Sequence, residues 1–413
     1  MPLNTPSTHI QKGEKRMRRM LIAVGVVAAL VVGSGSASAN HRSPGKAKKK
    51  GPAGTSVFAS GFNNPRGLTF GPGGNLYVAE GGLGGADSTV GLCTQASGAG
   101  GPYTGSTNNK VLGGRISKVT PGGVVSTVVD ALPSSQTSAA IGSLVSGVSS
   151  VAFINHKLYG LLAGAGCSHG VKDVPNGVIS VGAGGTWSLL ANLSAFQAAN
   201  PVADPDLEDF EPDGTWYSMI SAGGALYPMD SNHGELDRVD QHGNISRVVD
   251  ISAQVGHIVP TAIALRGDDD EQSHHSHGWK GHGHGKNNRI PKFFIGNLGV
   301  FGPPDGTVPN EHVYRLSRKA KLTVFASGLE QVLGLAFRHG KLYALESSTT
   351  PGGPTPGTGA IVRVKNGAPA ETVASGLIFP TGMTVGPDGA FYVSEQGFGF
   401  PAGAGRVIRI AVH

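Results

Sequence analysis

The strongest constraint on this chain is a sequence unit that it repeats. Residues 57–61 recur letter for letter at 324–328. The following residues also match, because 67–80 and 334–346 each read as an apolar strand, a tight turn and a second strand. A third copy stands at 382–395, near the C-terminus. Each copy is the signature of a β-hairpin, and such self-similarity is typical of repeat folds.

Looser copies fill the middle of the chain and bring the number of units to six. An aromatic residue marks the second strand of each unit: Tyr77, Tyr159, Tyr227, Phe294, Tyr343 and Tyr392. Units continue into a third strand, such as 114–119, and a fourth, such as 124–129. Four strands per unit predict a propeller blade. We therefore expect an all-β fold, a six-bladed β-propeller over residues 55–413.

The two ends of the mature chain complement each other. The last unit holds only three strands and ends at 406–410, whereas a strand without a hairpin partner, 56–60, opens the mature chain. We expect this N-terminal strand to complete the last blade. Such three-plus-one closure leaves no free sheet edge.

Residues 1–39 have the three parts of a signal peptide. A basic stretch at 12–19 precedes an apolar run at 20–32, and Ala37-Ser38-Ala39 is a cleavage site. The run is shorter than the about 20 residues that a membrane helix needs. We expect a secreted, extracellular protein cleaved after Ala39, with no transmembrane segment in the mature chain. The general secretory and twin-arginine routes both stay open.

Charge separates the N-terminal segments from the body. The chain has a net charge of +6, yet residues 1–39 carry five Lys or Arg and one Glu, and 40–54 carry five more basic residues and no acid. Residues 40–54 therefore predict a basic disordered linker. The remaining body is slightly acidic, so no basic face argues for a nucleic-acid partner.

Loop lengths predict which face is functional. Connections between second and third strands, such as 81–113, and between blades, such as 194–214, are long, whereas the other turns are mostly short. In a four-stranded blade both long classes emerge on one face, which we call the long-loop face; the opposite one is the short-loop face. Long loops on a rigid scaffold commonly carry function.

The last residue of the second strand is polar in five of six units. These strand-end residues are Glu80, Leu162, Asp230, Asn297, Glu346 and Glu395. Carboxylate and amide oxygens are the ligands that Ca²⁺ prefers. One interpretation is a calcium site in which the five polar side chains surround one centre at the channel mouth. The other is that each accepts hydrogen bonds from backbone N–H groups of nearby loops.

Two further clusters leave similar alternatives. Acidic residues crowd one inter-blade loop: Asp204, Asp206, Glu208, Asp209, Glu211 and Asp213. They are either a second Ca²⁺ site or a solvated loop. A His-rich low-complexity insert, 268–289, interrupts a turn on the short-loop face. It either binds metal ions loosely or is a solvated insertion.

The two cysteines, Cys93 and Cys167, predict a disulfide. Both fall in second-to-third strand loops, of the first and second blades, and so emerge on the same face. Export makes oxidation available, and the two Cα atoms must then come within about 7 Å.

Several stretches resemble known propellers. Residues 226–240 look like an NHL-repeat blade, with His233 in its Asn-His element. Over 55–413 the chain is similar to the ScyD/ScyE family of exported propellers, on the stretches 295–299, 344–348, 356–360 and 394–399. That resemblance implies the fold and export but no settled reaction. Residues 67–70 and 76–80 also resemble blades of soluble quinone-dependent sugar dehydrogenases, for which Arg66 and His257 are isolated candidates. The strand-end residues also resemble the ring of Glu, Asn and Asp with which six-bladed lactonases hold Ca²⁺.

Together these patterns favour a monomeric binding or scaffold module. Its partner would be a small molecule, a polymer or a protein on the long-loop face. The alternative is a Ca²⁺-dependent lactonase or hydrolase, or a quinone-dependent sugar oxidoreductase. No nucleophile elbow, P-loop or His-Glu-x-x-His motif is present.

Overall fold

The computed structural model describes residues 54–96, 102–106, 113–137, 145–207, 209–266, 290–299, 311–350 and 354–412. They belong to the second of two compact units, Gly51–His413, which we consider by itself. The predicted signal peptide, nearly all of the linker and the His-rich insert lie outside the described residues.

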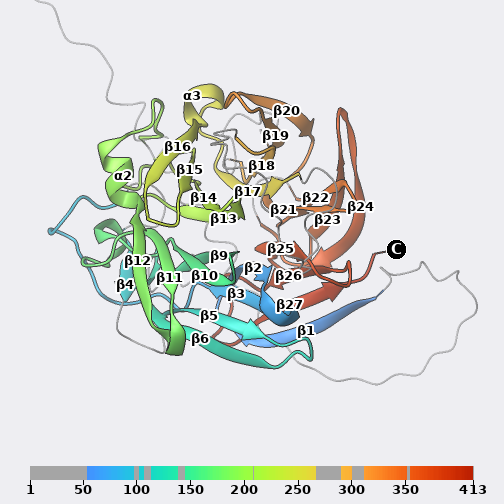
Figure 1. The fold of residues 1–413 in the computed structure, drawn as a ribbon, viewed down its shortest axis with the longest axis horizontal. Coiled ribbons are helices and arrows are strands. Elements are labelled where there is room, and N and C mark those ends of the chain that lie inside the picture. The colour runs from blue at the N-terminus through green and yellow to red at the C-terminus, as the bar shows by residue number, and fades with distance from the viewer. Residues whose placement is uncertain are drawn as a thin grey trace, which may run out of the picture. The chain divides into compact units, whose positions relative to one another are not determined.

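Six four-stranded antiparallel sheets account for most of the described residues and confirm the predicted fold (Figure 1). Blade 1 contains β2 (Pro65–Phe70), β3 (Leu76–Glu80), β5 (Gly114–Val119) and β6 (Val125–Leu132). Blade 2 contains β9 (Val148–Ile154), β10 (Lys157–Leu162), β11 (Gly177–Val181) and β12 (Trp187–Asn192). Blade 3 contains β13 (Trp216–Ala222), β14 (Ala225–Asp230), β15 (Glu235–Val239) and β16 (Ile245–Asp250).

The second half of the chain repeats the pattern. Blade 4 contains β17 (Pro260–Leu265), β18 (Phe293–Asn297), β19 (His312–Leu316) and β20 (Leu322–Ser327). Blade 5 contains β21 (Val332–Arg338), β22 (Lys341–Glu346), β23 (Gly359–Lys365) and β24 (Ala368–Leu377). Blade 6 contains β25 (Gly382–Val385), β26 (Phe391–Glu395) and β27 (Gly405–Ile410), and its fourth strand is β1 (Thr55–Phe62).

The chain ends close the ring as predicted. Strand β1 pairs antiparallel with β27, with Val57 opposite Ile408 and Ser60 opposite Arg406, and the two strands lie side by side in Figure 1. The innermost strands β2, β9, β13, β17, β21 and β25 each contact the next, and β25 contacts β2 again. Every blade therefore has two neighbours.

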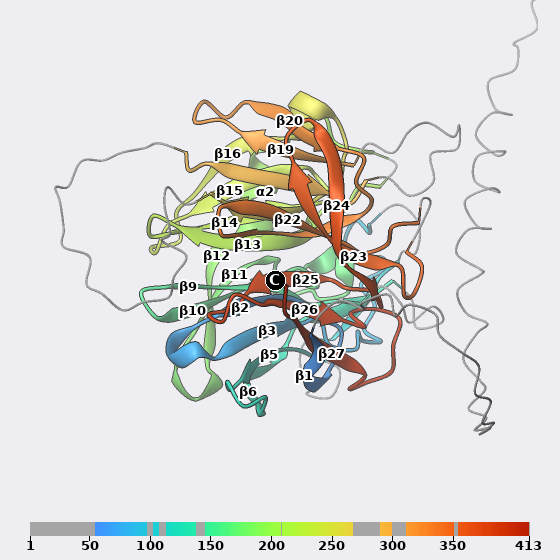
Figure 2. The ribbon, with the colours of Figure 1, turned by 90° about the vertical axis from the view of Figure 1, so that its right-hand side faces the viewer.

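Apolar side chains on both faces of each blade fill the space between blades. Along β14, Leu226 packs against blade 2 and the adjacent Tyr227 against blade 4, as the alternation of a strand requires. Figure 2 shows the successive sheets of blades 2 and 3 next to each other. Hydroxyl groups near the axis add bonds between blades: Ser150 Oγ donates to Met219 O at 3.2 Å, and Thr381 Oγ1 to Pro65 O at 2.6 Å.

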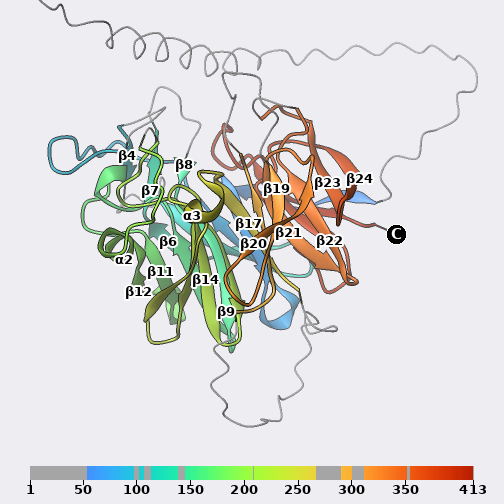
Figure 3. The ribbon, with the colours of Figure 1, turned by 90° about the horizontal axis from the view of Figure 1, so that it is seen from above.

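The long connections meet on one face, which confirms the loop assignment. Strands β4 (Thr104–Ser106), β7 (Ser134–Gln136) and β8 (Val145–Ser146) form a small sheet there (Figure 3). Strand β4 lies between the second and third strands of blade 1, whereas β7 and β8 lie between blades 1 and 2. Two short helices, α2 (Leu193–Ala199) and α3 (Ser252–Val255), follow the outermost strands of blades 2 and 3. Across the described ranges, no helix combines the length and apolar character needed to cross a membrane.

Candidate functional site

The strand-end carboxylates of blades 1 and 6 are bound within their own blades. Glu80 is fully buried; its side chain accepts hydrogen bonds from Asn63 N at 2.7 Å and from Arg115 Nε at 2.8 Å. Glu395 likewise accepts from Ile378 N and from Arg406 Nε, both at 2.6 Å. In each case the arginine stands opposite the glutamate on the third strand, farther from the axis.

The other polar strand-end residues also bind backbone groups, but without a third-strand arginine. Glu346 accepts from Glu330 N at 2.9 Å; burial raises the pKa of its carboxyl to about 7, and Ala360 faces it on the third strand. Asp230 accepts from Thr215 N at 3.2 Å and Asn232 N at 2.8 Å. Asn297 donates to Ile258 O at 3.0 Å and accepts from His312 N at 2.7 Å, and Leu162 is buried in the core.

The five polar residues therefore fasten the backbone that leads into the first strand of their own blade. In the part of the chain that the structure describes, no three His, Cys, Asp or Glu side chains are grouped as a metal ion requires. The expectation that Glu80, Asp230, Asn297, Glu346 and Glu395 surround one centre is thus corrected. Their oxygens accept from backbone N–H groups and, at Glu80 and Glu395, from third-strand arginines, so this donor set does not fit a shared Ca²⁺.

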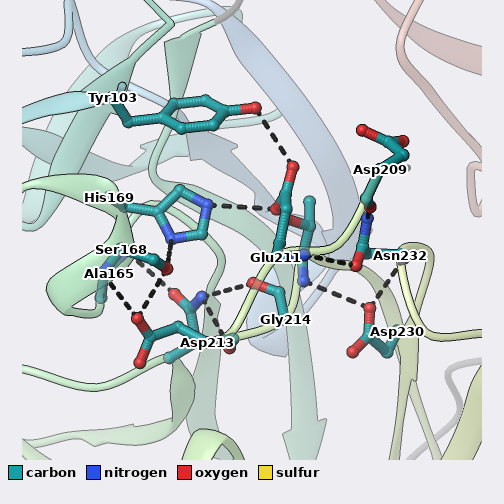
Figure 4. Close-up of polar contacts among 12 residues, drawn as sticks. Tyr103, Ala165, Ser168, His169, Asp209, Glu211, Asp213, Gly214, Asp230 and Asn232 are labelled. Carbon is teal, nitrogen blue, oxygen red and sulfur yellow. Dashed lines mark hydrogen bonds and ion pairs between the residues drawn. The ribbon is translucent and has the colours of Figure 1, made fainter. Parts of the chain in front are cut away.

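A polar cluster lies instead on the long-loop face, where loops of blades 1, 2 and 3 meet (Figure 4). His169 ends the 3₁₀ turn η2 (Cys167–His169), and its Nε2 is 3.1 Å from Glu211 Oε2. Tyr103 Oη donates to Glu211 Oε1 at 3.1 Å. Burial opposes a charge on His169, but the bonds and charges of Glu211 and Asp213 outweigh it and raise the pKa of the imidazole. The site therefore favours an imidazolium–carboxylate pair.

Ser168 completes an arrangement that superficially matches a Ser-His-acid triad. Its Oγ is 3.3 Å from His169 Nδ1. However, Ser168 is fully buried, and both its N–H and its hydroxyl donate to Asp213 Oδ2, at 2.7 and 2.6 Å. A nucleophile must reach substrate and give its proton to the base. The hydroxyl here does neither, so the cluster holds loops together.

The predicted disulfide is present and joins the same loops. Cys93 and Cys167 are bonded, with Cα atoms 6.2 Å apart. Thr89 Oγ1 also donates to Cys167 O at 2.5 Å. The blade 1 loop is thereby tied to η2 by a covalent bond as well as by hydrogen bonds.

The acidic inter-blade loop does not form one site. Glu211 and Asp213 belong to the cluster above, whereas Asp204 N donates to Ser252 Oγ and Asp209 O accepts from Asn232 Nδ2. Asp206 Oδ2 is 3.7 Å from His257 Nε2. Glu208 lies outside the described residues. The structure thus spreads these acids along the long-loop face.

Two of the three secondary candidates, His233 and His257, are brought near each other and near Asp230, whereas Arg66 belongs to blade 1. His233 stacks on Phe210 with ring centroids 4.8 Å apart, and its Nδ1 is 3.7 Å from Asp230 Oδ2. Burial lowers the pKa of His257 despite its neighbour Asp206. Arg66 lies on β2, the innermost strand of blade 1, and its Nη2 donates to Val145 O at 2.6 Å.

Sequence reasoning missed an acidic cluster buried between blades 2 and 3. Asp230, Glu235 and Asp237 all have zero exposed area. Of these three acids, only Glu235 forms an ion pair with Arg247. Gln197 of α2 donates to Asp230 and Glu235. Burial and the neighbouring Glu235 raise the pKa of Asp237 to about 8. The alternation of Glu235 and Asp237 on β15, opposite a strand-end acid, was the available signal.

Comparisons with known proteins support the fold alone. No family model matches the chain, and no curated protein is similar to it. A candidate oxidoreductase (glucose dehydrogenase) from Thermus thermophilus is 14% identical, with a TM-score of 0.50, over 86% of this chain and 99% of that chain. A protein of unknown function from Bacteroides thetaiotaomicron is 10% identical, with a TM-score of 0.49, over 87% and 76%. The chain is a six-bladed β-propeller, and its resemblance to the ScyD/ScyE family stays a prediction.

Proposed function

We propose that this chain is an exported binding module that engages its ligand with the long-loop face. The observation that carries the proposal is that the loops above blades 1–3 are fastened into one layer. The small sheet, the Cys93–Cys167 bond and the His169–Glu211–Tyr103 cluster all contribute to it. A pre-ordered surface binds with less loss of conformational freedom than mobile loops do.

Exposed apolar side chains support the choice of this layer as the contact surface. Leu92 and Leu207 lie in its loops and are 66% and 76% exposed. Export, cleavage after Ala39 and membership of the ScyD/ScyE family are part of the proposal. The signal sequence supports export, and so does the disulfide, since such bonds persist mainly in oxidising compartments.

Substitutions on the two faces test the proposal. We would measure retention of residues 40–413 by dextran, alginate and polylysine in affinity electrophoresis. The variants are Leu92→Asp and Leu207→Asp on the long-loop face. The matched control is Val124→Asp, because Val124 is 65% exposed in a turn of the short-loop face.

Loss of retention in the long-loop variants alone is the expected result. Equal loss in Val124→Asp, or no loss in either long-loop variant, would contradict the choice of face. The rival Ca²⁺-dependent hydrolase activity is tested separately, by metal analysis followed by a lactone and ester screen with and without chelator. Chelator-sensitive turnover would favour the Ca²⁺-dependent hydrolase instead.

A further inference from the structure

The innermost strands place one cation at the long-loop end of the ring axis. The residue after the first position of each innermost strand, or its equivalent before β25, is Arg66, Ser149, Tyr217, Thr261, Leu333 or Thr381. Arg66 is the only charged member of this set. The strand-end acids lie one strand farther out and bind within their own blades.

Tyr217 shows that this position reaches the axis. Its Oη donates to Thr381 O at 2.9 Å. Tyr217 belongs to blade 3, and Thr381 leads into blade 6, on the opposite side of the ring. The phenol must therefore cross the centre. Arg66 occupies the equivalent position in blade 1, and its charge acts on this phenol, whose pKa burial raises to about 12.

Arg66 has no acidic partner among the described residues. Nη1 donates to Gly397 O and Nη2 to Val145 O, and a guanidinium has five N–H groups, so three remain for another acceptor. By contrast, Arg115, Arg247 and Arg406 each pair with a carboxylate. Burial lowers the pKa of Arg66, and among the described residues Tyr217 is the titratable group whose charge acts on it.

A half-buried cation without a counter-charge is costly to desolvate, and an anion would offset that cost. We propose that Arg66 anchors a binding site for a small oxyanion, a carboxylate or phosphate group, at the axial end of the long-loop face. The planar fork of arginine matches such groups with two parallel hydrogen bonds. The inference rests on the proposed function, because it names what one part of the long-loop face binds.

Calorimetric titration tests this site with acetate and with inorganic phosphate at constant ionic strength. We expect saturable binding to the mature protein and at least tenfold weaker binding to Arg66→Met. The matched control is Arg338→Met. Arg338 also donates to two backbone carbonyls, Gly389 O and Val412 O, but it ends β21 at the short-loop face. The affinity of Arg338→Met for both anions should stay within twofold of that of the parent. Acetate and phosphate together show whether the site prefers a planar or a tetrahedral anion.

A second measurement on the unmodified sequence covers the case in which Arg66→Met fails to fold. Phosphate should protect Arg66, but not Arg338, from phenylglyoxal, as mapped by mass spectrometry. Absence of saturable binding, equal losses in both variants, or equal protection of both arginines would overturn the proposal. If only the anion titration fails while Leu92→Asp still abolishes retention, the binding face stands and the oxyanion site falls. If the anions bind at Arg66 but Leu92→Asp keeps its retention, the oxyanion site stands and the proposed binding face falls.

Discussion

At the scale of single residues, the orientation of a carboxylate decides what it does. Glu80 and Glu395 were expected at a shared centre, yet each faces an arginine on its own third strand. The sequence shows Arg115 and Arg406 as ordinary alternating strand residues. It does not show that the backbone N–H groups of Asn63 and Ile378 approach the same carboxylates, because those contacts depend on how the inter-blade segments enter the ring.

This orientation predicts unequal costs for the same substitution. Glu80→Gln leaves Arg115 without its carboxylate and should lower the free energy of unfolding by about 3 kcal/mol. Glu346→Gln should cost less than about 1 kcal/mol at pH 6. Glu346 has no arginine opposite, and its pKa of about 7 keeps much of the carboxyl protonated. Urea unfolding of both variants at pH 6 measures the difference, and equal losses would contradict it.

The buried acids of blade 3 predict a pH dependence of stability. The pKa of Asp237 is raised to about 8, so the folded state binds a proton that the unfolded chain releases near pH 4. The contribution of protonated Asp237 to the free energy of unfolding is therefore fully present at low pH and is lost as the pH rises toward 8. Asp237→Asn should remove this slope, gaining about 1 kcal/mol per pH unit over the parent between pH 5 and 8.

Urea unfolding at several pH values checks the slope. Asp240→Asn is the matched control, because hydrogen bonds from Asn244, against slight burial, lower the pKa of Asp240. Its pH profile between 5 and 8 should parallel that of the parent. A parallel profile for Asp237→Asn as well would show that Asp237 is ionised in the folded protein.

At the scale of elements, the layer above blades 1–3 depends on contacts between distant segments. The disulfide was predictable, since the repeat places both cysteines in equivalent loops of neighbouring blades. The pairing of His169 with Glu211 was not, because one lies in a second-to-third loop and the other in an inter-blade loop of variable length. The small sheet of β4, β7 and β8 was missed for a similar reason. Its short strands lack the alternation that marks blade strands.

Removing the disulfide tests this layer. The bond closes a loop of 74 residues, so the double variant Cys93→Ser/Cys167→Ser should lose about 4 kcal/mol of unfolding free energy on the loop-entropy model. Unfolding of the parent with and without reductant should give the same loss. Thiol titration of the unfolded, unreduced parent should find no free thiol. Two reactive thiols per chain would refute the bond.

At the scale of the whole molecule, the architecture was predictable because six copies of one pattern constrain each other. Each copy predicts a hairpin. The three-strand last unit and the N-terminal strand without a hairpin partner together predict how the ring closes. The site at the axis was not predictable to the same degree. That Tyr217 spans from blade 3 to Thr381 before blade 6 follows only from the closed ring.

Closure itself can be tested by removing β1. Deleting residues 55–61 should open blade 6, expose the edge of β27 and abolish cooperative unfolding. A synthetic peptide of residues 54–62 should restore cooperativity by adding the missing strand. Scanning calorimetry follows both steps. A truncated chain that unfolds as cooperatively as the parent would show that the ring does not need this strand.

The central claim is that the long-loop end of the axis presents a cation, while the strand-end acids face their own blades. Anomalous diffraction from crystals soaked in selenate, and separately in terbium as a stand-in for Ca²⁺, tests it most directly. The account predicts a selenium peak beside the Arg66 guanidinium, placed so that selenate oxygens accept hydrogen bonds from it, and no terbium peak shared by Glu80, Glu346 and Glu395. A terbium ion held jointly by those three carboxylates, with no selenate at Arg66, would contradict it.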